Sequence, residues 1–188
     1  MRRLIASTFV TLDGVMEAPD KWQLKNDLFD EAMGPVVNAA YTAADSLLLG
    51  RVTYQEFAGF WPNQSDEDPF AKLINDMPKF VVSTTLQRLD WKNSHLIQGN
   101  VAGEVTKLKQ QAGGDILIPG SAKLVSSLTD DGLIDEYQLF VHPVVVGRGK
   151  RLFQDGIDPR LLKLVDTQAF GTGVVVLTYR PKGKAVVD

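Results

Sequence analysis

The chain has 188 residues, of which 44% are hydrophobic and 23% charged, an ordinary composition for a single soluble globular domain. Its formal net charge of −3 argues against general nucleic-acid binding. It has no cysteine, which excludes a disulfide scaffold, a thiol nucleophile and a thiolate metal site, and which fits a reducing cytoplasm.

The chain opens with MRRLIASTFVTLDG, where two arginines precede an apolar run. A secretory signal would need a longer apolar core, whereas Asp13-Gly14 end this run early. We therefore expect a buried first strand over Leu4–Val10. No stretch approaches the ~18 apolar residues of a membrane span, so we expect a cytoplasmic protein without a membrane partner.

Strand-length apolar runs recur along the chain, and several are apolar on both faces, as in the middle of a parallel sheet. After the first, they are Ser46–Leu49, Lys79–Ser83, His95–Ile97, Asp115–Ile118, Glu136–Val146, Leu162–Ala169 and Val174–Tyr179. Helix-like segments lie between them, at Asp27–Ala43, from Thr53 onwards, at Val101–Ala112 and at Ser121–Asp131.

The alternation of strands and helices predicts right-handed crossovers and a mostly parallel sheet. Gly171-Thr172-Gly173 stands between the last two strands and predicts a hairpin turn, so the sheet should end antiparallel. We expect one α/β domain over residues 1–188, with a mixed central sheet and flanking helices.

In open α/β sheets, ligands bind beyond the carboxyl ends of the strands, and four places in this chain fit that rule. The first is GRVTY, where Gly50 lets the backbone turn and a ligand approach closely. Thr53 stands near a helix start, whose free N–H groups suit a phosphate, and Arg51 could bind an additional phosphate in bidentate fashion. A glycine turn, a surface arginine and a capping threonine explain the same spacing equally well.

The second place is LIPGSAKL, where a buried strand ends in Pro119-Gly120-Ser121 and a helix follows. Backbone N–H groups at Gly120 and Ser121 would suit a pyrophosphate, although a serine-capped helix is the simpler reading in isolation. The third is VVSTTL, where Ser83 and Thr84 could contact a ribose or a phosphate. On its own this stretch reads as a polar loop.

The fourth place is KWQLKNDLFDEA, in which Trp22 is an apolar residue in a polar setting. Asp27 stands at the start of the predicted long helix, a position that capping and the helix dipole favour. Its functional alternative is a pocket carboxylate that holds a substrate and helps to deliver a proton. His95 and His142 lack metal-binding spacing, so we expect no metal, and His142 beside Pro143 reads as structural.

The four strand ends occur together and in a fixed order, and on them the chain resembles the dihydrofolate reductase superfamily. The resemblance is to the branch similar to the reductase domain of bacterial riboflavin biosynthesis. The matching pieces span nearly the whole chain and are STFVTLDGVMEAP, LLLGRVTYQEFAGFWP, PKFVVSTTL, DILIPGSAKLVSSLTDDGLIDEYQLFVHPVVVGRGKRLF and the closing hairpin. The resemblance implies a three-layer fold with a mostly parallel sheet and antiparallel C-terminal strands.

The same resemblance implies NADPH as the cofactor. Arg51 would lie on the 2′-phosphate side, Gly120 in the turn under the pyrophosphate, and Asp13 in the loop that covers the nicotinamide. The full set of implied cofactor-binding residues is Ala6, Asp13, Gly14, Val15, Gly50, Arg51, Val52, Thr53, Ser83, Thr84, Pro119, Gly120, Ser121, Ala122 and Leu124.

On the substrate side, WQLKNDL is similar to the Trp-x-Leu-x-x-Asp-Leu stretch of dihydrofolate reductases. This similarity implies a catalytic acid at Asp27, and we expect Trp22, Asp27 and Tyr54 to bind substrate. The rest of the chain resembles the riboflavin-type branch instead, so a capping role for Asp27 stays open.

These observations support two main functional hypotheses. The first is an NADPH-dependent reductase that transfers a hydride to a small heterocycle resembling a pteridine, a pyrimidine or 5-amino-6-(5-phosphoribosylamino)uracil. The alternative is a homodimer that binds a nucleotide or folate-like ligand without turnover. A third reading is a protein that uses the fold only to dimerise, and the resemblance implies a homodimer in each case.

Overall fold

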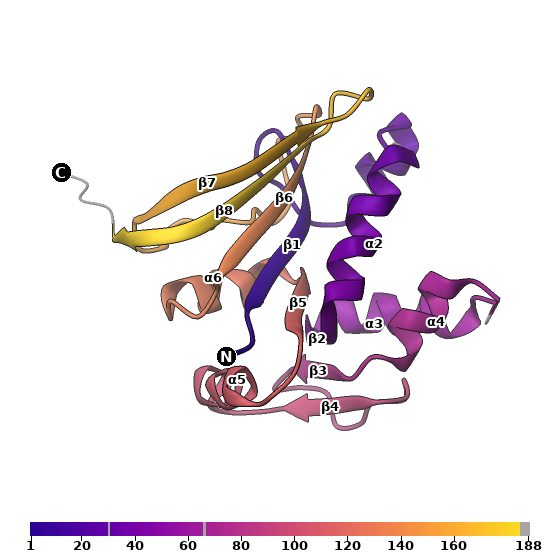
Figure 1. Ribbon diagram of the computed structural model, residues 1–188, viewed down its shortest axis with the longest axis vertical. Helices are drawn as coiled ribbons and strands as arrows, with labels where there is room; N and C mark the ends of the chain where they lie inside the picture. The colour runs from indigo at the N-terminus through magenta and orange to yellow at the C-terminus, as the bar shows by residue number, and fades with distance from the viewer. Residues whose placement is uncertain (30, 66, 185–188) are drawn as a thin grey trace.

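The computed structural model describes residues 1–29, 31–65 and 67–184, and one eight-stranded sheet runs through this part of the chain. The spatial order of its strands is β4-β3-β2-β5-β1-β6-β8-β7 (Figure 1). Neighbours from β4 to β6 are parallel, whereas β8 is antiparallel to both β6 and β7. The strands are β1 (Leu4–Thr11), β2 (Ala44–Gly50), β3 (Lys79–Val82), β4 (Ser94–Ile97), β5 (Asp115–Gly120), β6 (Glu136–His142), β7 (Arg160–Ala169) and β8 (Val175–Lys184).

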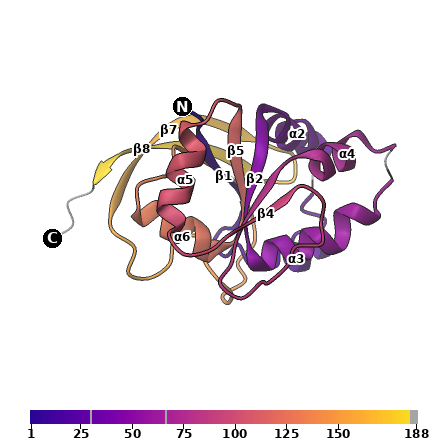
Figure 2. The ribbon, with the colours of Figure 1, turned by 90° about the horizontal axis from the view of Figure 1, so that it is seen from below.

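Helices cover both faces of the parallel part of this sheet, which gives the expected three-layer α/β fold. Figure 2 shows α5 and α6 on one side of the sheet and α2, α3 and α4 on the other. The α-helices are α1 (Pro19–Trp22), α2 (Gly34–Ala43), α3 (Arg51–Phe60), α4 (Pro69–Asp76), α5 (Val101–Gln110) and α6 (Ala122–Asp130). Short 3₁₀ turns add η1 (Leu24–Asn26), η2 (Glu31–Met33) and η3 (Trp61–Asn63).

Alternation along the strands builds two main cores, one on each face. Leu4 and Ala6 of β1 join the core under α5 and α6, which includes Val105 and Leu128. Ile5 points to the opposite face and packs in the core beside α2, α3 and α4. Because these strands are buried on both faces, several strand sequences are apolar throughout and do not alternate between apolar and polar residues.

Each of the eight predicted strands is present, and the predicted hairpin joins β7 to β8. The long helix predicted over Asp27–Ala43 is wrong in the described residues before Gly34; residue 30 of that range lies outside the described part of the chain. Asp27 ends η1 in a left-handed conformation with φ of 49°, and α2 begins only at Gly34, with proline in its first turn. Because proline is pre-organised for the first helical turn, the Gly34-Pro35 pair was the true start signal.

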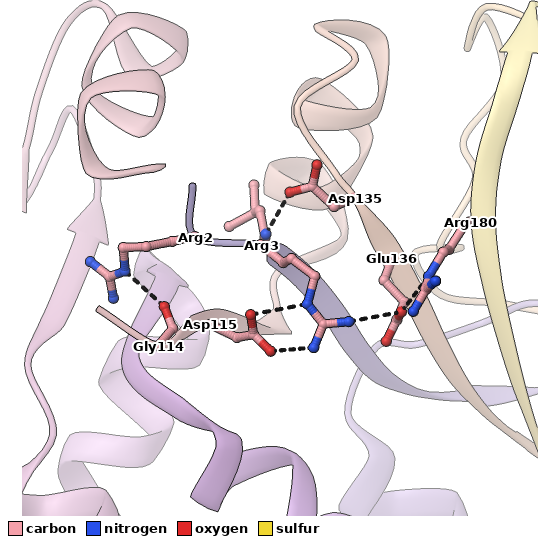
Figure 3. A network of polar contacts seen from close by, with 8 residues as sticks. Arg2, Arg3, Gly114, Asp115, Asp135, Glu136 and Arg180 are labelled. Atoms are coloured by element: carbon pink, nitrogen blue, oxygen red, sulfur yellow. Dashed lines mark hydrogen bonds and ion pairs between the residues drawn. The ribbon is translucent and has the colours of Figure 1, made fainter. Parts of the chain in front are cut away.

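A buried arginine closes the edge of the sheet where the parallel strands begin, which we call the amino edge. Arg2 is 7% exposed, and its Nε donates a hydrogen bond of 2.9 Å to the carbonyl oxygen of Gly114 (Figure 3). Its guanidinium also contacts Asp45 and donates to Ser46 Oγ at 2.5 Å. Arg2 therefore joins the starts of β1, β2 and β5.

A second arginine extends this network across the sheet. Arg3 pairs with Asp115 at 2.5 Å and with Glu136 at 3.3 Å, and Glu136 also accepts from Arg180 at 2.9 Å (Figure 3). These contacts link β5, β1, β6 and β8 in their spatial order. The amino edge is thus closed by charged side chains that satisfy one another.

Candidate functional site

The first two predicted places meet at the opposite edge, where β2 and β5 end, which we call the carboxyl edge. These strands are neighbours, and Leu49 lies in register with Gly120. A Cβ atom added to Gly50 would lie 2.3 Å from Ser121 Oγ and 3.2 Å from Ser121 N. A Cβ added to Gly120 would lie 2.7 Å from Thr53 Oγ1. A side chain at Gly50 would therefore displace Ser121, and one at Gly120 would displace the Thr53 hydroxyl, so glycine suits the close contact of the two strand–helix turns.

Two helices start side by side at this contact without a capping side chain. Gly50 precedes α3 and Ser121 precedes α6, and among the described residues no side chain caps either helix start. By contrast, Asp68 caps α4 and Asn100 caps α5. The first backbone N–H groups of α3 and α6 are thus left for another acceptor, and the helix dipoles favour an anion there. The serine-capped reading of LIPGSAKL does not describe this geometry.

The third place lies next along the same edge. Gly50 is in register with Val82, so Arg51 and Ser83 both follow directly at the carboxyl edge. Ser83 Oγ accepts from Thr85 N at 3.2 Å and from Leu86 N at 3.0 Å, which closes a tight turn. Thr84 in that turn and the side chain of Arg51 are exposed, and Arg51 donates to Gln55 at 2.9 Å.

The loop after β1 is held by the side chain of Asp13. Its carboxylate accepts from Thr11 Oγ1 at 2.6 Å, from Gly147 N at 2.8 Å and from Val146 N at 3.2 Å. These hydrogen bonds, that of Thr11 first, lower the pKa of Asp13 to about 2. The turn uses Gly14 at φ of 82°, which places Val15 in the protein interior, while Ala6 is buried within β1. This loop is therefore fixed to the segment that follows β6.

Trp22 forms a buried wall beside the end of β6. Its indole Nε1 donates to the carbonyl oxygen of Glu17 at 3.0 Å, and its ring meets the edge of the His142 ring, with centroids 5.1 Å apart. Gln23 also contacts His142, with 3.0 Å between the two side-chain nitrogens. His142 Nδ1 lies 2.8 Å from the carbonyl oxygen of Phe140, and burial lowers the pKa of this histidine. The imidazole therefore anchors the Trp22 segment, as a structural histidine does.

The other two predicted substrate residues have different surroundings from Trp22. Asp27 is exposed and its carboxylate has no hydrogen-bond or ion-pair partner among the described residues. Tyr54 is 4% exposed within the core beside α3, where its hydroxyl accepts from Trp91 N at 3.1 Å. The structure thus gives Tyr54 a packing role and does not bring it together with Trp22.

A carboxylate that the sequence reasoning missed lies one helical turn after Thr53. Glu56 is exposed, yet partial desolvation, followed by the charges of Asp20 and Glu17, raises its pKa, while Lys21 and Lys150 oppose the rise. Asp20 and Lys21 belong to α1, the short helix that ends at Trp22, so the charges of that helix act on Glu56 of α3. The i, i+3 spacing from Thr53 was the available signal, because such residues share a helix face.

Residues 2–176 match the family model described as the RibD C-terminal domain. The chain belongs to this family. The match confirms the resemblance to the riboflavin-type branch. A relative in Bacillus subtilis (strain 168), "Uncharacterized protein YyaP", is 35% identical over 185 residues, covering 97% of this chain and 96% of the relative.

Solved structures share the fold of this chain. A putative riboflavin biosynthesis protein from Shewanella sp. PV-4 is similar with a TM-score of 0.74 at 19% identity, covering 97% of this chain and 99% of that one. Dihydrofolate reductase from Enterococcus faecalis, in complex with NADP(H), has a TM-score of 0.58 at 14% identity, with 96% of both chains covered. At these identities the two structures show the shared fold.

Within the described ranges, no group of three or more histidine and acidic side chains is arranged to hold a metal ion. In that same part of the chain, no helix combines the length and the apolar character that crossing a bilayer requires.

Proposed function

We propose that this protein is an NADPH-dependent reductase that transfers a hydride to a small heterocycle. Membership of the RibD C-terminal domain family supports a reductase. The observation that carries the cofactor assignment is the pair of uncapped helix starts that meet at Gly50 and Gly120. Two adjacent helix N-termini suit the two phosphates of a dinucleotide, and glycine lets the backbone approach them.

The residues present could hold three parts of NADPH, namely the pyrophosphate, the 2′-phosphate and the nicotinamide. The starts of α3 and α6, with Gly50, Thr53 and Ser121, would hold the pyrophosphate. The exposed guanidinium of Arg51, beside the turn of Ser83 and Thr84, would hold the 2′-phosphate. Bound NADPH supplies the hydride. The remaining predicted residues, which would position the cofactor or cover its nicotinamide, are Ala6, Asp13, Gly14, Val15, Val52, Pro119, Ala122 and Leu124.

On the substrate side, this chain offers Trp22 as a flat apolar wall and two carboxyl groups as candidate proton donors. Asp27 is the donor that the resemblance implies, and Glu56 is the one that its surroundings favour. A carboxyl group with a raised pKa keeps its proton closer to neutral pH, as an acid for a ring nitrogen requires. A pteridine, a pyrimidine or a ribosylaminouracil would each present such a nitrogen.

Titration with the two nicotinamide cofactors tests the assignment of Arg51. The change Arg51→Ala should weaken NADPH binding on the order of tenfold and leave NADH binding unchanged, because only NADPH has the 2′-phosphate. Arg88→Ala is the control, since Arg88 is an exposed arginine that pairs with Asp90. Equal loss for both cofactors would refute the 2′-phosphate role.

Oxidation of NADPH with dihydrofolate or 5-amino-6-(5-phosphoribosylamino)uracil tests whether turnover occurs. Glu56→Gln and Asp27→Asn then identify the proton donor, because loss of a general acid costs about 10²–10⁴-fold in rate.

Saturable NADPH binding without oxidation would favour a ligand-binding homodimer. No rise in melting temperature with NADPH at ~100 times a typical Kd, where linkage gives ~2.7 kcal/mol, would favour a purely structural protein.

We also propose that the protein acts as a single domain over residues 1–188, in the cytoplasm and as a homodimer. The lack of cysteine supports a reducing compartment. Cell fractionation tests the location, and sedimentation tests the assembly.

A further inference from the structure

Lys79 is a buried charge that no carboxylate neutralises. This first residue of β3 is 0% exposed, and no carboxylate pairs with its ammonium group in the part of the chain that the structure describes. Its Nζ donates to the carbonyl oxygens of Asn75 at 2.6 Å and Lys92 at 3.3 Å, and it lies 4.0 Å from the centroid of the Trp91 ring. Two carbonyls and one indole face match in number the three N–H groups of a charged lysine.

The charge of Lys79 is unfavourable for the fold by itself. Burial is the largest cause that lowers its pKa to about 8, and the charge of Lys92 adds to the shift, while Asp76 opposes it. The unfolded chain therefore holds this proton more firmly, so the unfolding free energy rises as the pH increases from about 8 toward 10.5. Near neutral pH the folded protein thus carries a buried charge that an apolar side chain of similar size would avoid.

The charges nearest to this ammonium group largely pair among themselves. Asp76 accepts from Lys72 at 2.5 Å and from Lys92 at 2.8 Å, and Arg88 pairs with Asp90 at 2.5 Å. The titratable groups that α3, α4, β4 and the loop before β4 bring to this region are Tyr54, Lys72, Asp76, Arg88, Asp90, Lys92 and His95. The partners that Lys79 itself contacts are therefore dipoles and a ring.

These partners place Lys79 under the loop that contains Trp91. Asn75 lies in the last turn of α4 and Lys92 in the loop before β4, so the two carbonyls join α4 to this loop. The backbone N–H of Lys79 donates to the carbonyl oxygen of Asn93 at 2.8 Å, and Trp91 Nε1 donates to Asn75 Oδ1 at 2.8 Å. The indole of Trp91 is thus held at its N–H and at its ring face.

Trp91 in turn supports α3. Its backbone N–H donates to the hydroxyl of Tyr54 at 3.1 Å, and the centroids of the two rings are 6.2 Å apart. Tyr54 lies in the first turn of α3, which begins at Arg51, and Lys79 begins the strand that Ser83 follows. The layer of Lys79, Trp91 and Tyr54 therefore connects the two elements whose carboxyl-edge ends carry Arg51 and Ser83.

We propose that Lys79 is a positioning residue whose ammonium group acts through Trp91 and Tyr54 to hold the start of α3 against the turn that follows β3. This spacing sets how well Arg51 and that turn fit a 2′-phosphate, so Lys79 contributes to a preference for NADPH over NADH. The inference rests on the proposed function, because it concerns the same cofactor site. It also gives the buried Tyr54 a supporting role beneath the cofactor.

Binding of the two nicotinamide cofactors tests the proposal. Lys79→Met keeps most of the side-chain length without the charge, and it should lower the ratio of NADPH to NADH affinity about 2- to 30-fold in the folded protein. Tyr54→Phe leaves Lys79 unchanged and should lower the same ratio to a smaller extent, which keeps the test decisive if Lys79→Met does not fold. Lys107→Met is the matched control, because Lys107 is an exposed lysine of α5 that pairs with Glu104.

The emission of Trp91 provides a second readout, which a purely structural side chain would not affect. Trp22→Phe and Trp61→Phe leave Trp91 as the sole tryptophan of the chain. Its emission should then change in a step near pH 8, as the ammonium group 4.0 Å from the ring loses its proton, and Lys79→Met should abolish that step.

Two results would overturn the proposal. One is an affinity ratio that stays unchanged in Lys79→Met and Tyr54→Phe, or that falls equally in Lys107→Met. The other is an emission step that is missing from the unmodified background or that persists in Lys79→Met. If the unmodified chain binds neither cofactor, the proposed function fails and this inference falls with it. If the unmodified chain binds NADPH and the ratio does not respond, the inference alone fails.

Discussion

The amino and carboxyl edges of the sheet differ in whether their polar groups are paired within the protein. At the amino edge, Arg2 and Arg3 bond to carboxylates and a carbonyl of neighbouring strands. At the carboxyl edge, α3 and α6 begin without a capping side chain, and a Cβ at Gly50 would lie 2.3 Å from Ser121 Oγ. One edge satisfies its own hydrogen-bonding groups, and the other keeps donors available for a ligand.

The difference separates stability from binding within one sheet. A buried charge that loses its partner destabilises the fold, whereas uncapped helix starts retain electrostatic potential for an anion. We therefore expect changes at the amino edge to affect unfolding, and changes at the carboxyl edge to affect NADPH binding. The following predictions test this division.

Arg2→Met should give the largest effect, on stability alone. The change leaves Asp45, Ser46 and the Gly114 carbonyl without their buried partner, which should cost about 3 kcal/mol of unfolding free energy. Urea denaturation measures the loss, with Arg88→Met as the control for an exposed pair. A fall in NADPH affinity of the folded variant as large as the loss of stability would break the division between the edges.

Gly50→Ala should mainly affect binding. The added Cβ displaces Ser121, which should weaken NADPH binding on the order of 100-fold, or about 2.7 kcal/mol. The double variant Gly50→Ala with Ser121→Gly removes the clashing hydroxyl and should recover part of the affinity. Gly59→Ala on the same helix is the control, because its Cβ would have no neighbour within 4 Å. Titration calorimetry measures all three, and a similar loss for Gly59→Ala would count against the site.

Two helix starts provide a sharper comparison. Asp68 accepts from the first-turn N–H groups of α4, so Asp68→Ala should cost about 1 kcal/mol of unfolding free energy. Ser121 precedes α6 without such a bond, so Ser121→Ala should cost less than about 0.5 kcal/mol. Thermal unfolding compares the two variants. An equal cost would mean that Ser121 caps α6 in solution.

The smallest expected effect is a dependence of stability on acid pH that arises from His142. Burial lowers the pKa of His142 in the folded state, so the unfolded chain binds its proton more readily. The contribution is fully present above the unfolded pKa of about 6.5 and is lost as the pH falls below it. His142→Asn should flatten the unfolding free energy between pH 5 and 7 by comparison with His95→Gln, an exposed control. If His142→Asn left the pH dependence of the unfolding free energy unchanged, the assigned role of His142 would be contradicted.

The strands could be predicted because each combines apolar content with a short length, and both of these are local properties. The start of α2 could not be placed by periodicity, since the apolar spacing continues through residues 27–29 and 31–33, which lie outside any α-helix. Gly34-Pro35 marked the true start, and α4 likewise begins at a proline, Pro69.

The carboxyl edge was predictable from motifs that end strands, because parallel strands bring their ends together. The contact between Gln23 and His142 was not, since 119 residues separate them and only the fold brings them together. The same holds for Glu56, whose altered pKa depends on charges from other loops. Tyr54 lies in a matching motif, yet its position four residues after Gly50 turns it toward the core.

The place of β1 in the middle of the sheet has a consequence for how the chain folds. Leu4 pairs with Ile116 and Ile5 with Glu136, so the first strand to be synthesised has neighbours that lie far along the chain. At ~5–20 residues per second, β5 follows β1 by roughly 6–22 s. During that interval the apolar β1 lacks its native partners, and such delayed pairing makes folding slow and exposes the nascent chain to aggregation. Chaperones that bind short apolar segments on the ribosome would find their target in the first eleven residues.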